Sequence, residues 1–75
     1  MQTLREAFED NTRIKTLRLI RSTGEYIAKL PIEEAIEQYG DWTYCNAYSE
    51  SYTEMLVWIS KPYKMIKICY NKGEM

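Results

Sequence analysis

The spacing of apolar side chains predicts a helix in the middle of the chain, over residues 31–40. Its apolar positions recur at intervals of three and four, which places them on one side of an α-helix: Ile32, Ala35, Ile36 and Tyr39. Pro31 suits the first helical position, and Gly40 can end the helix in the left-handed conformation. Because segments typical of strands flank this helix, we expect it to pack across a β-sheet.

A second, shorter helix is expected over residues 3–10. Thr3 and Glu6 have the spacing of a capping box, in which each residue binds the backbone N–H of the other. A helix of this length is unstable alone in water, so Leu4 and Phe8 are expected to dock on the rest of the domain.

Alternation of apolar and polar residues predicts five strands. They are expected over residues 13–21, 26–30, 42–48, 52–60 and 64–70. The alternation is imperfect in the first strand, which indicates a bulge or an edge position. The element order α-β-β-α-β-β-β predicts an α+β fold, with two short helices packed on one face of a small antiparallel or mixed sheet of about five strands.

The alternation also assigns a face to each strand residue. The expected core beneath the helices consists of Cys45, Ala47, Met55, Val57, Ile59, Ile66 and Ile68. The opposite face is expected to carry large aromatic side chains together with a leucine and a lysine: Trp42, Tyr44, Tyr48, Leu56, Trp58 and Lys67. An error of one residue in the phase of a strand would exchange the two faces.

The composition is that of one small folded domain, residues 1–75. Hydrophobic residues make up 45% of the chain and charged residues 28%, with a net charge of −1. The longest strongly apolar run, residues 55–59, is too short to span a membrane, and no signal peptide is apparent. We therefore expect a cytoplasmic protein whose Cys45 and Cys69 are reduced thiols, with Cys45 buried.

Few residues offer catalytic chemistry. The chain has no histidine, its two cysteines are far apart in sequence, and its three glycines are isolated. These features argue against His-assisted nucleophiles, structural zinc and phosphate-binding loops. We predict that the chain is not an enzyme and has no catalytic, metal or cofactor site.

The aromatic sheet face is the main functional candidate. Tyrosine and tryptophan are enriched at protein-binding hot spots, so the face predicts contact with a protein partner of unknown identity or with a second copy. One alternative is single-stranded nucleic acid, bound by the aromatics with Arg18 and Lys67. Another is a purely structural domain, in which the aromatics fill a second core.

In size and in its lack of catalytic groups, the chain resembles the small accessory and inhibitor proteins of phages and other mobile elements. Such proteins often act by covering the surface of a partner, so this resemblance also implies a protein-binding role.

Overall fold

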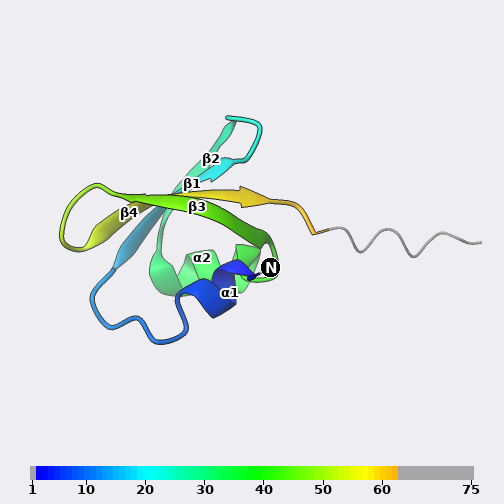
Figure 1. The fold of residues 1–75 in the computed structure, drawn as a ribbon. Coiled ribbons are helices and arrows are strands. Elements are labelled where there is room, and N and C mark those ends of the chain that lie inside the picture. The colour runs from blue at the N-terminus through cyan, green and yellow to red at the C-terminus, as the bar shows by residue number, and fades with distance from the viewer. Residues whose placement is uncertain (1, 63–75) are drawn as a thin grey trace, which may run out of the picture.

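The computed structural model describes residues 2–62, which form two helices and four strands (Figure 1). The helices are α1, Leu4–Ala7, and α2, Ile32–Tyr39. The strands are β1, Thr16–Arg21; β2, Tyr26–Pro31; β3, Thr43–Ser49; and β4, Glu54–Ser60. The strand expected over residues 64–70 lies outside the described residues.

The four strands form one mixed sheet in the order β2-β1-β4-β3. Strands β1 and β2 form one antiparallel hairpin, and β3 and β4 form another. The two hairpins meet in the middle of the sheet, where β1 and β4 run parallel. This arrangement fits the predicted α+β class, and four of the five expected strands are present in residues 2–62.

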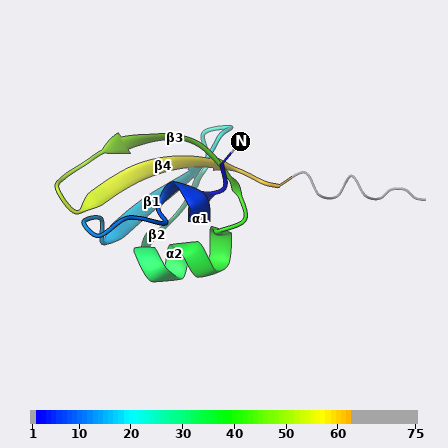
Figure 2. The same ribbon diagram turned by 60° about the horizontal axis from the view of Figure 1, so that its bottom comes forward.

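Both helices lie on the same side of the sheet (Figures 1 and 2). The side chains buried between the two layers come from α1, α2, β1, β4 and the segment before β1: Leu4, Ile14, Leu17, Leu19, Ala35, Val57 and Ile59. The predicted core positions Ala47 and Met55 pack against this cluster, while Ile66 and Ile68 lie outside the described residues. The predicted burial of Val57 and Ile59 is confirmed.

Helix α2 has the predicted apolar side facing the sheet. Ala35 is fully buried, and the other three residues of the stripe pack against the core: Ile32, Ile36 and Tyr39. The prediction for Gly40 is wrong, because its φ of −60° and ψ of −26° are right-handed. Glycine is needed for space instead, since an added Cβ would collide with the Ile36 carbonyl oxygen and lie 2.7 Å from Arg5 Nη2.

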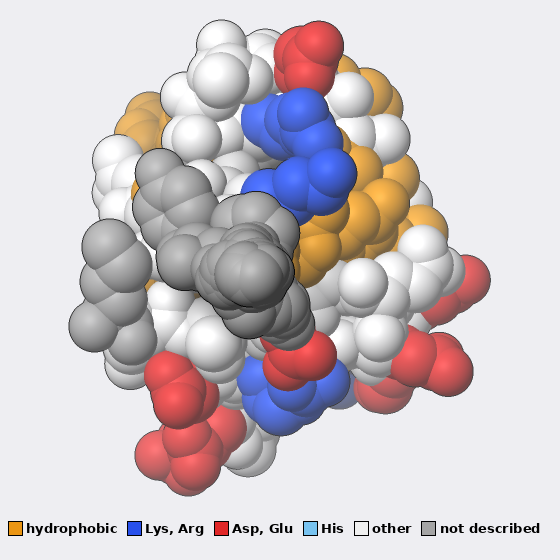
Figure 3. Space-filling model, turned by 90° about the vertical axis from the view of Figure 1, so that its right-hand side faces the viewer, with side chains coloured by type: hydrophobic (Ala, Val, Ile, Leu, Met, Phe, Trp, Pro, Cys, Tyr) orange, Lys and Arg blue, Asp and Glu red, His pale blue; other side chains and the backbone are white. Residues whose placement is uncertain are grey.

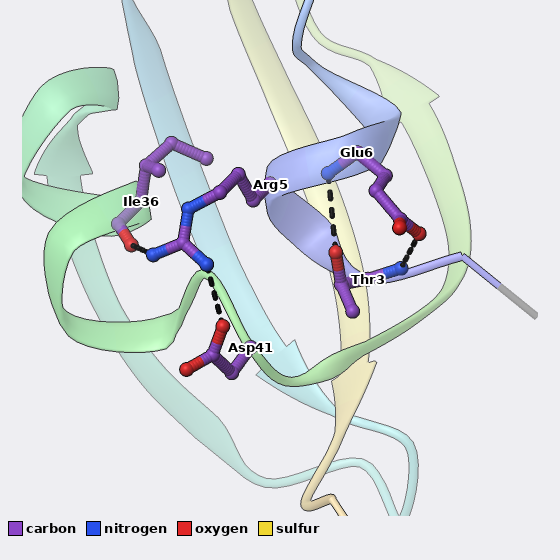
Figure 4. Close-up of polar contacts among 5 residues, drawn as sticks. All are labelled: Thr3, Arg5, Glu6, Ile36 and Asp41. Carbon is purple, nitrogen blue, oxygen red and sulfur yellow. Dashed lines mark hydrogen bonds and ion pairs between the residues drawn. The ribbon is translucent and has the colours of Figure 1, made fainter.

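Helix α1 is shorter than predicted, but its capping box is present (Figure 4). Thr3 Oγ1 accepts a hydrogen bond from the Glu6 N–H at 3.2 Å, and Glu6 Oε1 accepts one from the Thr3 N–H at 3.0 Å. Arg5 then connects the helices, because its guanidinium donates to Asp41 Oδ1 and, at 3.4 Å, to the Ile36 carbonyl. These bonds hold a single turn of helix against the end of α2.

Strand β1 starts at Thr16 rather than at residue 13 because Asn11 organises the preceding loop. The Asn11 Oδ1 accepts from the backbone N–H groups of Arg13, at 3.1 Å, and Ile14, at 2.8 Å. Its Nδ2 group donates to the Ile14 carbonyl at 3.0 Å. An asparagine that satisfies nearby backbone groups in this way favours a turn over an extended strand.

Candidate protein interface

The side of the sheet away from the helices carries a band of apolar side chains. On this side Ile20 of β1 lies opposite Tyr26 of β2 and Trp58 of β4, and Leu56 of β4 lies opposite Tyr48 of β3. The same alternation puts two cations and an anion on this side: Arg18, Lys29 and Glu54. We call these eight residues the open face, because no helix among residues 2–62 covers them.

The apolar band runs across all four strands and is most exposed at its ends. Tyr26 is 60% exposed and Tyr48 is 65% exposed, at opposite edges of the sheet. Between them Ile20, Leu56 and Trp58 are part-buried by their neighbours in the sheet. The two most exposed side chains of the band are therefore aromatic and lie at its two margins.

Charged side chains border the band at one end of the strands. Arg18 Nη1 lies 3.4 Å from Glu50 Oε1, and Arg18 Nε lies 3.8 Å from Glu54 Oε2. Lys29 Nζ is 3.7 Å from the same Glu54 oxygen. All four side chains are between a quarter and a little over half exposed, so these pairs contribute little stability. Their effect is to balance positive and negative charge on this part of the surface.

Three of the six predicted interface residues lie on the open face: Tyr48, Leu56 and Trp58. The predicted positions of Trp42 and Tyr44 are wrong, because both pack on the helix side. The Tyr44 ring meets the Phe8 ring edge to face with centroids 6.5 Å apart. Lys67 lies outside the described residues.

Trp42 closes one end of the core. Its ring meets Tyr39 of α2 edge to face at 5.1 Å between centroids, and the Arg21 guanidinium lies 5.6 Å from the Trp42 centroid. On the side of the molecule that Figure 3 faces, hydrophobic side chains reach the surface beside lysine and arginine side chains.

The cause of these errors is a bulge in β3. The register with β4 shifts between Tyr44, which pairs with Ile59, and Asn46, which pairs with Trp58. Cys45 is the extra residue, and it is exposed rather than buried as predicted. Because a bulge adds one residue to a strand, the first half of β3 has the opposite phase from the predicted one.

The predicted interface lacks five of the eight open-face residues, of which two are apolar, Ile20 and Tyr26, and three are charged, Arg18, Lys29 and Glu54. Leu17 and Leu19 are buried, so alternation along β1 puts Ile20 on the other side of the sheet. This alternation can be read from the sequence. Tyr26 reaches Ile20 through a second irregularity, between Leu19 and Ile20 in the pairing of β1 with β2. No pattern in the sequence predicts this shift in the register of β1 and β2.

The helix side also has two shallow hollows around Phe8. The larger, about 490 Å³, is bordered by α1, the loop before β1 and the ends of β3 and β4, and Phe8, Ile14 and Tyr44 contribute apolar side chains. The smaller, about 350 Å³, lies between Phe8 and the Ile32–Ile36 side of α2. Neither gathers groups with obvious catalytic chemistry, and within residues 2–62 no cluster of acidic or cysteine side chains is placed to hold a metal ion.

Comparison of the chain with protein-family models, curated proteins and solved structures finds no significant match. No helix in the described part of the chain is long and apolar enough to cross a membrane.

Proposed function

We propose that this chain is a non-catalytic protein-binding domain and that the open face is its binding surface. One observation carries the proposal. Within residues 2–62 both helices pack against the side of the sheet that holds Leu17 and Leu19, while the other side holds the apolar band. A contiguous apolar patch that no element covers commonly marks a site where a partner binds.

The chemistry of the band suits a protein. Tyr26, Tyr48 and Trp58 offer aromatic area with few rotatable bonds, and such side chains are enriched where proteins bind tightly. The charges at its border have the position of a polar rim around an apolar centre. A surface of this kind fits a protein partner with an apolar patch of similar size.

Single-stranded nucleic acid fits less well. The cations of the open face, Arg18 and Lys29, already lie beside Glu50 and Glu54, which would repel phosphate groups. The net charge of −1 adds no general attraction for a polyanion. A nucleic-acid complex would weaken steeply with added salt, and an apolar protein contact would not, so a salt titration separates the two functions.

The test compares two tyrosines of similar exposure. Tyr48→Ser removes a ring from the open face, whereas Tyr52→Ser removes one that is 74% exposed in the β3–β4 loop, where its ring lies beneath Arg13. Proteins that co-purify with the full chain from its native host would be compared among wild type, Tyr48→Ser, Trp58→Ser and Tyr52→Ser, together with self-association. We expect the first two substitutions to weaken binding at least tenfold, which equals about 1.4 kcal/mol, and Tyr52→Ser to leave it unchanged.

Circular dichroism of each variant is the control for folding. If folded Tyr48→Ser and Trp58→Ser chains bind every partner, and themselves, as the wild type does, the open face is not the binding surface.

A further inference from the structure

The charges on the open face and at its border are divided between the two halves of the sheet. Arg18 and Lys29 belong to the β1–β2 hairpin, whereas Glu54 and Glu50 belong to β4 and to the loop that precedes it. All four lie toward the same end of the sheet, because their side chains meet within 4 Å. One half of this end is therefore basic and the other half acidic.

The apolar band is divided along the same line. Ile20 and Tyr26 come from the β1–β2 hairpin, and Leu56, Trp58 and Tyr48 come from the β3–β4 hairpin. The dividing line passes between β1 and β4, which are parallel and lie at the centre of the sheet. Each half thus offers both apolar and charged side chains to whatever covers the face.

We propose that the open face binds a second copy of the chain, related by a two-fold axis that runs parallel to the strands, above the line between β1 and β4. This proposal rests on the proposed function and names its partner. A rotation about this axis exchanges β1 with β4 and β2 with β3, and it keeps the charged end of one sheet over the charged end of the other. Such an interface is self-complementary, as two-fold symmetry requires.

The register of the sheet gives the contacts across this interface. Ile20 and Trp58 are paired positions on β1 and β4, so Ile20 of one copy faces Trp58 of the other, and symmetry repeats the contact. Arg18 and Leu56 are paired in the same way. The Arg18 stem therefore covers Leu56 of the other copy, and its guanidinium lies near Glu54, the next side chain on that face of β4.

The second copy is expected on the face rather than at a sheet edge. At the β3 edge the Tyr44 N–H already donates to the Gln2 carbonyl at 2.9 Å, and the Asn46 side chain accepts from the Ala47 N–H at 2.9 Å. The β2 edge carries Lys29 and ends in Pro31. Lysine, proline and bulges are the features that prevent pairing between sheet edges.

The size of the face predicts a weak dimer. Four strands about 4.8 Å apart and six residues long, at about 3.3 Å per residue, give a face of about 20 by 20 Å. Its area of roughly 400 Å² is about half of what each partner buries in a standard stable interface. Self-association should therefore depend on protein concentration.

The test uses charge reversal on each half of the full chain. Sedimentation of the wild type over a concentration series up to about 1 mM should show a monomer–dimer equilibrium. The double variants R18E/K29E and E50K/E54K should each associate with themselves at least tenfold more weakly, because each carries like charges on both halves. Their equimolar mixture should form a heterodimer at least as stable as the wild-type dimer. The control E33K/E34K makes the same charge change as E50K/E54K, but on exposed positions of α2, and should dimerise like the wild type.

Other outcomes overturn the proposal in distinct ways. A wild-type chain that stays monomeric throughout the series has no second copy on its open face. If the wild-type chain is monomeric but the Tyr48→Ser substitution abolishes co-purification of another protein, the proposed function stands and the partner is that protein. Self-association that survives both charge reversals means that the copies meet elsewhere. Should a charge variant fail to fold, the Tyr48→Ser dimer dissociation constant decides: an unchanged constant rejects the arrangement, and a tenfold increase supports it.

Discussion

The two sides of the sheet use neighbouring residues for different purposes. On β1, Leu17 and Leu19 are completely buried beneath the helices, whereas Arg18 and Ile20 between and beside them face away. The helix side is closed by α1 and α2 and consists almost wholly of aliphatic side chains at its centre. The open face mixes aliphatic, aromatic and charged groups. We infer that the first side determines the stability of the domain and the second determines what it binds.

The largest expected effect is a loss of stability, and it is tested by making the same Leu→Ala substitution on each side of the sheet. Leu19→Ala removes a fully buried side chain and should lower the free energy of unfolding by about 2–5 kcal/mol, because it leaves a cavity. Leu56→Ala makes the same change on the open face and should cost about 1 kcal/mol or less. Urea unfolding followed by circular dichroism measures both values. Equal losses would mean that the open face is a second core.

An intermediate effect is expected at the point where the two helices meet. Gly40→Ala places a methyl group against the Ile36 carbonyl and the Arg5 guanidinium, and overpacking of this kind costs about 1–3 kcal/mol. The exposed Glu37 of α2 offers a control on the same helix, and Glu37→Ala should change stability by about 0.5 kcal/mol or less. Thermal unfolding of both variants checks this. A Gly40→Ala protein of unchanged stability would mean that Arg5 and the end of α2 can shift to make room for the methyl group without cost.

The last prediction concerns Cys45 and involves no expected change in stability. It tests which residues of β3 face each side of the sheet. Because Cys45 is the exposed extra residue of the bulge, a thiol reagent should label it in the native protein nearly as fast as in denaturant. The measurement would be made in a Cys69→Ser chain, so that a single thiol reports. Labelling that occurs only after unfolding would place Cys45 in the core and remove the bulge.

Much of the fold follows from local patterns in the sequence. The 3.6-residue periodicity of α2, the capping box of Thr3 and Glu6, and the alternation of β4 all correspond to observed elements. In each of these segments the hydrophobic pattern and the local hydrogen bonding favour the same structure, so each could be predicted without knowledge of its neighbours.

The predictions are wrong at positions where the pairing between two strands decides on which side of the sheet a residue lies. The residues 42–48 alternate regularly, but the register with β4 requires one extra residue at Cys45, which returns Tyr44 to the core. The same kind of shift brings Tyr26 opposite Ile20. A bulge is a property of two strands together, so periodicity within one strand cannot place it. Three of the six predicted interface residues, Tyr48, Leu56 and Trp58, therefore lie on the expected side of the sheet, whereas Trp42 and Tyr44 lie on the opposite side.

The parallel pairing of β1 with β4 has a consequence for how the chain folds. Each hairpin closes a short loop and can form early, but Leu17 reaches Met55 only after the two hairpins find each other. Contacts between distant parts of a chain slow folding, so we expect the docking of the hairpins to be the rate-limiting event. Substitutions that weaken the β1–β4 junction or a hairpin turn should then slow refolding, because the turns form before the limiting docking step and the junction forms during it.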